Sequence, residues 1–404
     1  MSESNTPIRV PYGMTVHGEA EIEAVNKVLR SSTQMGHHVR TFEQRVAALF
    51  DKQHGIMVNS GSSALLLGVE ILELPPGSEV ITPALTFSTT VASLLKNQLV
   101  PVFVDVSPAT YCIDVEQVES MIGPNTRAMC VPNLIGNIAN WPALAEVAKR
   151  HDLKIIEDSA DTLGGTIDGG ASGRWADVCI TSFYGSHVIN CAGNGGMLCV
   201  NDPAMADRAK LLRSWGRSSS LFVESEAIEN RFNVDLEGIQ YDAKFVFEAV
   251  GYNFEPSELG AAFGLVQLDQ LDANISARER HFNAQYEYFK RFEQWFELPR
   301  QAEGSRTGWL AFPLTVRPDA PFSRREMQIF LERKNIQTRV IFTGNINRQP
   351  GFRDIPKRVR DEGYPVADAV MRGGVLLACH HGLTDEMMAH VHSSFDEFAA
   401  QFRG

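Results

Sequence analysis

The sequence predicts an α/β protein whose larger part contains a mostly parallel sheet and whose C-terminal part is a smaller α/β unit. Between residues 55 and 161, apolar runs of strand length alternate with segments in which apolar residues recur every three or four positions. This alternation is typical of a parallel sheet with helices on both faces. A second alternation of the same kind after residue 300 indicates the smaller unit.

Two helices are expected first, within residues 15–50. The segments EAEIEAVNKVLRS and VRTFEQRVAALF carry apolar residues at helical spacing, and TQMGHH forms the turn between them. Strand and helix pairs follow. The predicted strands lie at 55–60, 79–87, 100–106, 127–136 and 153–161, and the predicted helices at 63–72, 89–97 and 141–151.

The stretch DVCITSFYGSHVINCAGNGGMLCV, residues 177–200, consists of two strand-like runs around a Gly-rich turn. Such a turn presents a side chain at the edge of a sheet, and the presented residue is His187. A helix at 203–216 and a long polar loop at 217–243 follow. We expect this loop to have a function, because structureless loops of such length are uncommon.

A helix at about 257–295 is expected to connect the two parts of the chain. Beyond it, strands at 308–316 and 336–342 and amphipathic helices at 323–334 and 384–402 predict a second domain. We therefore expect a large domain at 1–264 and a small domain at 265–404.

The composition bounds the class of protein. With 404 residues, 44% of them hydrophobic, the chain can bury a large core, and its net charge of −12 excludes a general nucleic-acid surface. Neither a signal-like N-terminus nor an apolar run of about 18 residues occurs, so we expect a cytoplasmic protein without a membrane segment. The cysteines form no CxxC pair and are expected to be buried free thiols: Cys112, Cys130, Cys179, Cys191, Cys199 and Cys379.

A short loop between a strand and a helix is the first candidate for ligand binding. Its N–H groups and hydroxyls, at the positive end of a helix, can hold a phosphate, although the same loop can be a plain N-cap. The residues concerned are Ser60, Gly61, Ser62 and Ser63.

Two later strand ends add an aromatic ring and carboxylates. Phe87 can stack on a flat ring or pack in the core. Asp158 and Asp161 lie at the end of a buried strand, at the sheet edge where ligands bind in open α/β folds, although an N-cap or a surface role is the alternative. Together with the phosphate loop and the SFYGSH segment, these residues form the pattern of a pyridoxal phosphate site.

With these motifs, the chain from about residue 10 to 400 resembles the fold-type I, aspartate-aminotransferase-like enzymes. Within them it resembles the DegT/DnrJ/EryC/StrS-like sugar aminotransferases and dehydratases, which act on nucleotide-linked 4-keto-6-deoxyhexoses. The resemblance implies a seven-stranded sheet in the large domain, SGSS as the phosphate loop and Phe87 as the ring stacker. It also implies that Asp158 pairs with the pyridinium nitrogen and that Asp161 lies in the cofactor site.

Two further residues follow from the resemblance. Ser182 would be another phosphate ligand. Asn253, in the GYN segment, would reach the cofactor phosphate of a neighbouring subunit. The resemblance therefore implies a homodimer with shared active sites.

The position of the Schiff-base lysine of the aminotransferases is occupied by His187, and no lysine occurs between Lys154 and Lys210. Imidazole forms no stable imine, so we expect pyridoxamine 5′-phosphate, bound noncovalently, with pyridoxal 5′-phosphate as its spent form. The same replacement marks the sugar 3-dehydratases. The segments TSFYGSHVI, VPNLIGN, KFVFEAVGYN and RVIFTGN are most similar to the dehydratases of GDP-4-keto-6-deoxymannose.

A second dehydratase branch uses an iron–sulfur cluster held by cysteines shortly after the catalytic segment. This chain has Ser218, Ser219 and Ser220 there, so neither a cluster nor another metal is expected. Two positions depart from the family pattern. Asn194 makes the usual GEGG turn GNGG, and Phe87 stands where the most similar members more often have Trp.

The implied reaction removes the hydroxyl at sugar carbon 3. His187 would act first as base and then as acid, which suits its ordinary pKa of about 6.5. The products would be the 3-deoxy ketosugar and ammonia, and L-glutamate would regenerate the amine. Candidate substrate-binding residues are Asn133, Arg217 and Arg339.

Three other interpretations stay open. His187 could be a turn histidine satisfied by the backbone. The chain could be a nucleotide-sugar aminotransferase that uses a lysine from elsewhere in the sequence. It could also be a catalytically inactive regulator that binds the cofactor.

Overall fold

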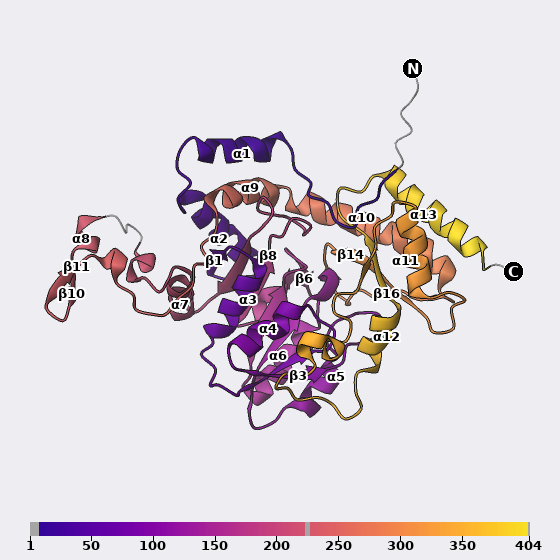
Figure 1. The fold of residues 1–404 in the computed structure, drawn as a ribbon, viewed down its shortest axis with the longest axis horizontal. Coiled ribbons are helices and arrows are strands. Elements are labelled where there is room, and N and C mark those ends of the chain that lie inside the picture. Colours follow the sequence, from indigo (N-terminus) through magenta and orange to yellow (C-terminus); the bar gives the residue numbers. More distant parts are fainter. Residues whose placement is uncertain (1–7, 223–226, 403–404) are drawn as a thin grey trace, which may run out of the picture.

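The computed structural model describes residues 8–222 and 227–402. Its central layer is a seven-stranded sheet in the order β1-β9-β8-β5-β4-β2-β3 (Figure 1). Only β9 runs antiparallel to its neighbours, so the predicted, mostly parallel α/β sheet is confirmed. The strands are β1 (His54–Val58), β2 (Glu79–Pro83), β3 (Val100–Val104), β4 (Thr126–Pro132), β5 (Lys154–Ser159), β8 (Val178–Ser182) and β9 (Gly196–Val200).

Helices cover both faces of this sheet, as the alternating pattern predicts. Adjacent side chains of a strand point to opposite faces, so Ile155 and Ile156 of β5 belong to two different apolar clusters. One cluster includes Phe42 and Leu144, and the other includes Leu65 and Leu212. The helices of this part of the chain are α1 (Glu19–Leu29), α2 (His37–Leu49), α3 (Gly61–Glu70), α4 (Ser88–Lys96), α5 (Val115–Val118), α6 (Trp141–His151) and α7 (Pro203–Arg213).

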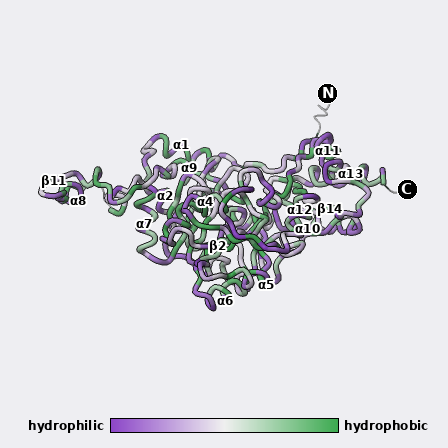
Figure 2. Tube along the Cα trace, turned by 60° about the horizontal axis from the view of Figure 1, so that its bottom comes forward, coloured by the Kyte–Doolittle hydropathy of each residue, from purple (hydrophilic) through white to green (hydrophobic). Residues whose placement is uncertain are grey.

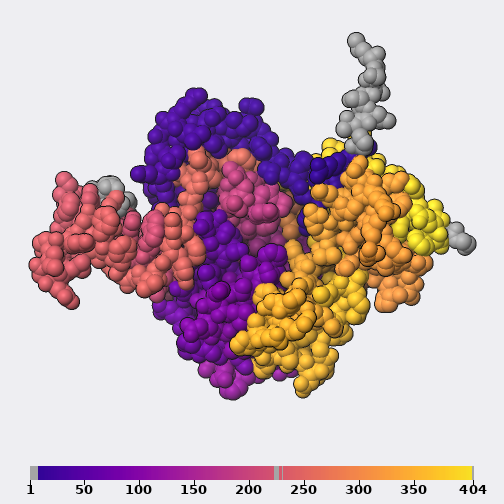
Figure 3. All heavy atoms as spheres, in the orientation of Figure 1, coloured from indigo at the N-terminus to yellow at the C-terminus, as the bar shows by residue number. Residues whose placement is uncertain are grey.

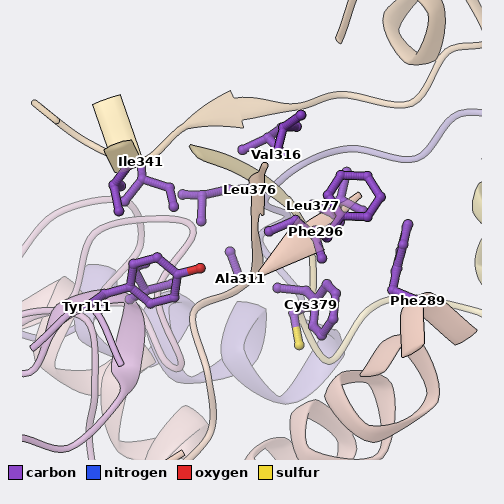
Figure 4. Close-up of a cluster of buried hydrophobic side chains, with 14 of the residues drawn as sticks. Tyr111, Phe289, Phe296, Ala311, Val316, Ile341, Leu376, Leu377 and Cys379 are labelled. Carbon is purple, nitrogen blue, oxygen red and sulfur yellow. The ribbon is translucent and has the colours of Figure 1, made fainter. Parts of the chain in front are cut away.

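The C-terminal part forms its own antiparallel sheet in the order β12-β14-β16-β15. Figure 4 shows its apolar side chains packed together, with Phe289 reaching in from a neighbouring helix. The strands are β12 (Phe296–Glu297), β14 (Ala311–Val316), β15 (Arg339–Val340) and β16 (Gly374–Ala378), and the helices are α11 (Arg324–Arg333), α12 (Pro365–Gly373) and α13 (Asp385–Ala400).

The connection between the two parts differs from the single predicted helix. It consists of α9 (Glu258–Asp269) and α10 (Leu271–Phe289), because Gln270 leaves the helical region with φ −101° and ψ 1°. The proposed domain boundary at 264/265 falls inside α9. The predicted strand at 336–342 is also shorter, since only β15 joins the sheet there and Ile336 forms an isolated bridge with Val10.

The segment at 217–243 is more than the predicted loop. Residues 217–222 and 227–250 form an arm that projects from the body in Figure 1 and in the turned view of Figure 2. The arm carries α8 (Ile228–Arg231) and an antiparallel hairpin of β10 (Val234–Leu236) and β11 (Ile239–Tyr241). The hairpin forms because Glu237 and Gly238 adopt positive φ angles, which a tight turn between strands requires.

Three short strands form a small sheet beside the large one: β6 (Thr166–Ile167), β7 (Gly170–Ala171) and β13 (Ser305–Arg306). In the described part of the chain, no helix is long and apolar enough to cross a membrane. All six cysteines are buried and free, as predicted.

Candidate active site

One pocket, of about 390 Å³, gathers most of the predicted site residues. It lies at the carboxyl ends of the parallel strands, the position at which open α/β sheets bind ligands. The predicted residues that line it are Ser60, Gly61, Ser62, Phe87, Asp158, Asp161, Ser182 and His187.

The SGSS loop is both an N-cap and a wall of this pocket. Ser60 is the N-cap of α3, and its Oγ accepts a hydrogen bond from the Ser63 N–H at 3.1 Å. Ser63 does not line the pocket, because its hydroxyl donates to Asn59 Oδ1 at 2.7 Å. The first-turn N–H groups of a helix lack intrahelical partners, so the loop can bind an anion.

Gly61 lets the loop approach the end of β8. A Cβ at this position would lie 2.5 Å from the Cβ of Ser182, closer than atoms can approach. Glycine therefore brings the N-terminus of α3 and the Ser182 hydroxyl to one corner of the pocket.

Asp158 is a buried carboxylate that lines the pocket. Its Oδ2 accepts a hydrogen bond from the Thr90 hydroxyl at 2.9 Å and its Oδ1 one from the Ala160 N–H at 3.2 Å. Burial raises its pKa above the ordinary value, and these hydrogen bonds oppose that shift. Thr90 also lines the pocket but was missed from the sequence, where only its position in α4, three residues after Phe87, could have indicated it.

Asp161 is held by an unusual backbone. Its Oδ2 accepts a hydrogen bond from the N–H of Ile135, which has a φ of 60°. A β-branched residue rarely adopts this left-handed conformation, so the surrounding structure must hold it there. Burial raises the pKa of Asp161 to about 7, and the charge of Asp158 adds to this shift.

His187 presents one ring nitrogen to the pocket. Its Nδ1 lies 3.1 Å from the Ser182 carbonyl oxygen. Because a carbonyl only accepts, Nδ1 carries the proton and Nε2 keeps its lone pair. Burial lowers the pKa of His187 to about 4, and the charge of Arg278 acts in the same direction. At neutral pH the imidazole is therefore a neutral base.

Four aromatic side chains of the described chain line the pocket besides His187. Phe87 is 51% exposed, so it is not the core residue of the alternative interpretation. Phe342 packs edge-on against it, with ring centroids 5.9 Å apart. Phe342, Tyr12, Tyr184 and Asn194 also line the pocket. Phe342 and Tyr12 were missed because they come from distant parts of the chain.

Asn133, predicted to bind substrate, is instead a core residue. Its Nδ2 donates to Glu157 Oε1 and Ser159 Oγ, and its Oδ1 accepts from the Trp141 indole N–H. The side chain is 0% exposed and does not reach the pocket. The prediction is therefore corrected: Asn133 ties the ends of β4 and β5 together.

Three more predicted residues, besides Ser63 and Asn133, lie outside the pocket of their own chain. Arg339 is exposed, and its guanidinium lies 5.4 Å from the ring centroid of Tyr12, which lines the pocket. Arg217 lies at the base of the arm, over the ring of Trp215 at 4.4 Å. Asn253 is exposed and pairs through its backbone with Ser214.

Among the residues that the structure describes, no lysine lines the pocket. No cluster of three or more histidine, cysteine or carboxylate side chains suited to a metal ion occurs within the described ranges. The pocket thus combines an anion-binding helix end, an aromatic wall, two carboxylates and a neutral imidazole.

Comparison with known proteins identifies a family and several relatives of the chain. A model of the DegT/DnrJ/EryC1/StrS aminotransferase family matches residues 16–396. The chain is 34% identical over 411 residues to dTDP-4-dehydro-2,6-dideoxy-D-glucose 3-dehydratase of Saccharopolyspora spinosa, covering 98% of this chain and 87% of that protein. It is 29% identical over 368 residues to GDP-perosamine synthase of Caulobacter vibrioides, covering 90% and 91%.

The fold is that of a solved relative. The structure of E. coli GDP-4-keto-6-deoxy-D-mannose-3-dehydratase with bound hydrated PLP superposes with a TM-score of 0.87, covering 96% of this chain and all of that one. The two sequences are 24% identical. This similarity shows the aspartate-aminotransferase-like fold.

Proposed function

The chain belongs to the DegT/DnrJ/EryC1/StrS aminotransferase family, and from that premise we propose that it is a pyridoxamine 5′-phosphate-dependent 3-dehydratase of a nucleotide-linked 4-keto-6-deoxyhexose. The observation that carries the proposal is His187. It lines the pocket with a free Nε2, while no lysine of the described chain reaches the same pocket. The 34% identical relative, a sugar 3-dehydratase, supports the same reaction.

The residues present fit the cofactor. The N-terminus of α3 and Ser182 would hold its phosphate, since only a glycine at position 61 leaves room for that corner. The exposed ring of Phe87 would stack on the cofactor ring, and Asp158 would pair with the ring nitrogen. When bound, the cofactor supplies an amino group and an electron-accepting aromatic ring.

His187 would move the proton in both directions. Its Nε2 takes a proton as the reaction begins, because burial keeps the imidazole neutral. The imidazolium then gives this proton readily to the hydroxyl leaving carbon 3. The sugar loses one oxygen atom, nitrogen leaves as ammonia, and L-glutamate restores the amine. No iron–sulfur partner enters this balance.

We propose GDP as the nucleotide of the substrate, with dTDP as the alternative. The sequence favours GDP-4-keto-6-deoxymannose, and the relatives named above include proteins acting on or forming dTDP-linked and GDP-linked sugars. Arg339 beside Tyr12 is a candidate for the diphosphate or for a glutamate carboxylate. Arg217 is a candidate for the same groups in a neighbouring subunit.

We also propose a homodimer with shared sites. Large apolar side chains are exposed along the arm, which stands clear of the body in the space-filling view (Figure 3). Exposed apolar patches of this kind mark interfaces. Asn253 lies next to the base of the arm, where a partner would meet it. The exposed side chains are Phe222, Ile228, Phe232, Leu236, Ile239, Tyr241, Phe245, Phe247 and Val250.

Product stoichiometry tests the function against the aminotransferase alternative, which the 29% identical perosamine synthase favours. The protein is incubated with GDP-4-keto-6-deoxymannose, pyridoxal 5′-phosphate and glutamate. A dehydratase releases ammonia and 2-oxoglutarate in equal amounts, whereas an aminotransferase yields 2-oxoglutarate without ammonia. If neither ammonia nor 2-oxoglutarate forms with this sugar or with the dTDP-linked sugars, the result favours the interpretation as an inactive regulator.

A further inference from the structure

A buried guanidinium lies directly behind His187. Arg278, in α10, is 0% exposed, and no carboxylate within the described residues forms an ion pair with it. A buried charge normally has a partner of opposite charge, because desolvation costs several kcal/mol. Instead, Arg278 donates only to main-chain carbonyls.

These carbonyls belong to two walls of the pocket. The Arg278 Nη1 donates to the carbonyl oxygens of Trp309 at 3.0 Å and Leu310 at 3.2 Å. Its Nη2 donates to the carbonyl oxygen of His187 at 3.2 Å. Both His187 and Leu310 line the pocket, so one side chain fixes the β8–β9 turn against the start of β14.

The same contacts continue across the pocket. The Leu310 N–H donates to the Ile135 carbonyl at 2.8 Å, and the Ile135 N–H donates to Asp161 at 2.9 Å. These contacts therefore link the main chain of His187, through Arg278, to the carboxyl group of Asp161.

The charge of Arg278 also acts on its surroundings. The titratable groups near it are Tyr12, Cys379, His281, His380 and His381, none of them a carboxylate. The positive field is thus not neutralised at close range. It lowers the pKa of His187 in addition to the effect of burial, whereas the Ser182 carbonyl raises it.

We propose that Arg278 is a positioning residue for His187: it fixes the main chain of the β8–β9 turn, and its unpaired cation disfavours a second positive charge on the imidazole. The inference rests on the proposed function, in which His187 moves the proton. Arg278 itself does not reach the pocket.

Three variants separate geometry from charge. Arg278→Lys keeps the charge but cannot reach three carbonyls at once, and Arg278→Met keeps the volume but loses both. Arg306→Met is the control, because Arg306 is an exposed arginine of the same region with surface ion pairs only. Thermal melting establishes which variants fold.

The first readout needs no substrate. The ring signals of His187 in the cofactor-free protein, identified by their loss in His187→Asn, are followed by NMR across pH. Removing the cation should raise the titration midpoint in Arg278→Met, whereas Arg278→Lys and Arg306→Met should titrate as the parent does. An unchanged midpoint in folded Arg278→Met contradicts the charge effect.

The second readout is kinetic. Both Arg278 variants should lower kcat by about tenfold to a hundredfold with little change in KM, because a displaced base costs turnover rather than binding. Parental kcat in Arg278→Lys overturns the positioning role, and this holds even if Arg278→Met does not fold. If the chain proves to have no dehydratase activity, the NMR titration still decides the effect on His187.

Discussion

At the scale of single residues, the tautomer of His187 decides which ring nitrogen can act as a base. The Ser182 carbonyl fixes the proton on Nδ1, so the turn-histidine interpretation is correct for one nitrogen and the proposed base is the other. Replacement by asparagine keeps a polar side chain but cannot carry a proton near neutral pH. We expect His187→Asn to abolish dehydration while the affinity for pyridoxamine 5′-phosphate stays near the parental value. Measurable turnover by the variant would show that His187 is not the base.

The raised pKa of Asp161 has a consequence for stability. A carboxyl group whose pKa is near 7 in the folded state and near 4 in the unfolded state stabilises the fold below about pH 4 and loses this contribution as pH rises to about 7. Asp161→Asn retains an acceptor for the Ile135 N–H without titrating. The cofactor-free variant should therefore gain stability relative to the parent across this window, by up to about 1.4 kcal/mol per unit of pKa shift.

Denaturant unfolding at several pH values measures this difference. The exposed Asp319→Asn serves as the control. A constant difference between Asp161→Asn and the parent from pH 4 to 8 would be inconsistent with a proton held at Asp161.

Sequence reasoning found the pocket residues that lie at or next to strand ends, because the parallel topology brings such positions together. Ser60, Asp158 and Ser182 are of this kind. It failed for Asn133, since a strand-end amide can turn inward as easily as outward, and only the positions of Glu157 and Trp141 decide which. It could not find Tyr12 or Phe342, whose places depend on how the C-terminal unit packs against the large sheet.

At the scale of elements, the contact between α3 and β8 is a close one. A side chain on Gly61 would displace Ser182 and with it the end of β8. We expect Gly61→Ala to weaken cofactor binding and to destabilise the fold by about 1–3 kcal/mol, as overpacking usually does. Calorimetric titration and thermal melting measure the two effects.

Gly351→Ala provides the matched control, because a Cβ there would meet nothing within 4 Å. If Gly61→Ala binds the cofactor as the parent does, the SGSS loop is an N-cap only.

The regular elements were predictable because α2 carries apolar residues at helical spacing and β3 is an apolar run of strand length. The arm was only partly predictable. Its strands span three residues each and its apolar residues face outward, so no periodic pattern marks them. The break at Gln270 has no proline or glycine to signal it.

At the scale of the whole molecule, the shared site is tested by mixing subunits. His187→Asn and Asn253→Glu are each expected to be inactive as separate proteins, the latter because a carboxylate would repel the cofactor phosphate. In a mixed dimer, one site collects both changes and the other none. Activity should therefore reappear after subunit exchange, at up to the level of one intact site per mixed dimer.

If exchange is demonstrated and the mixture stays inactive, Asn253 does not act in the partner's site and the sharing is wrong. The domain boundary at 264/265 and the cytoplasmic location remain predictions from the sequence, because no contact or distance described above tests either of them.

The mass of the sugar product tests the central claim most directly. The purified protein is incubated with GDP-linked and dTDP-linked 4-keto-6-deoxyhexoses, pyridoxamine 5′-phosphate and glutamate, and the products are analysed by mass spectrometry, with His187→Asn as the control. The account predicts a product that is lighter than one of these substrates by one oxygen atom and that is absent from the control. A product in which the ketone oxygen has been replaced by an amino group would contradict it and identify an aminotransferase.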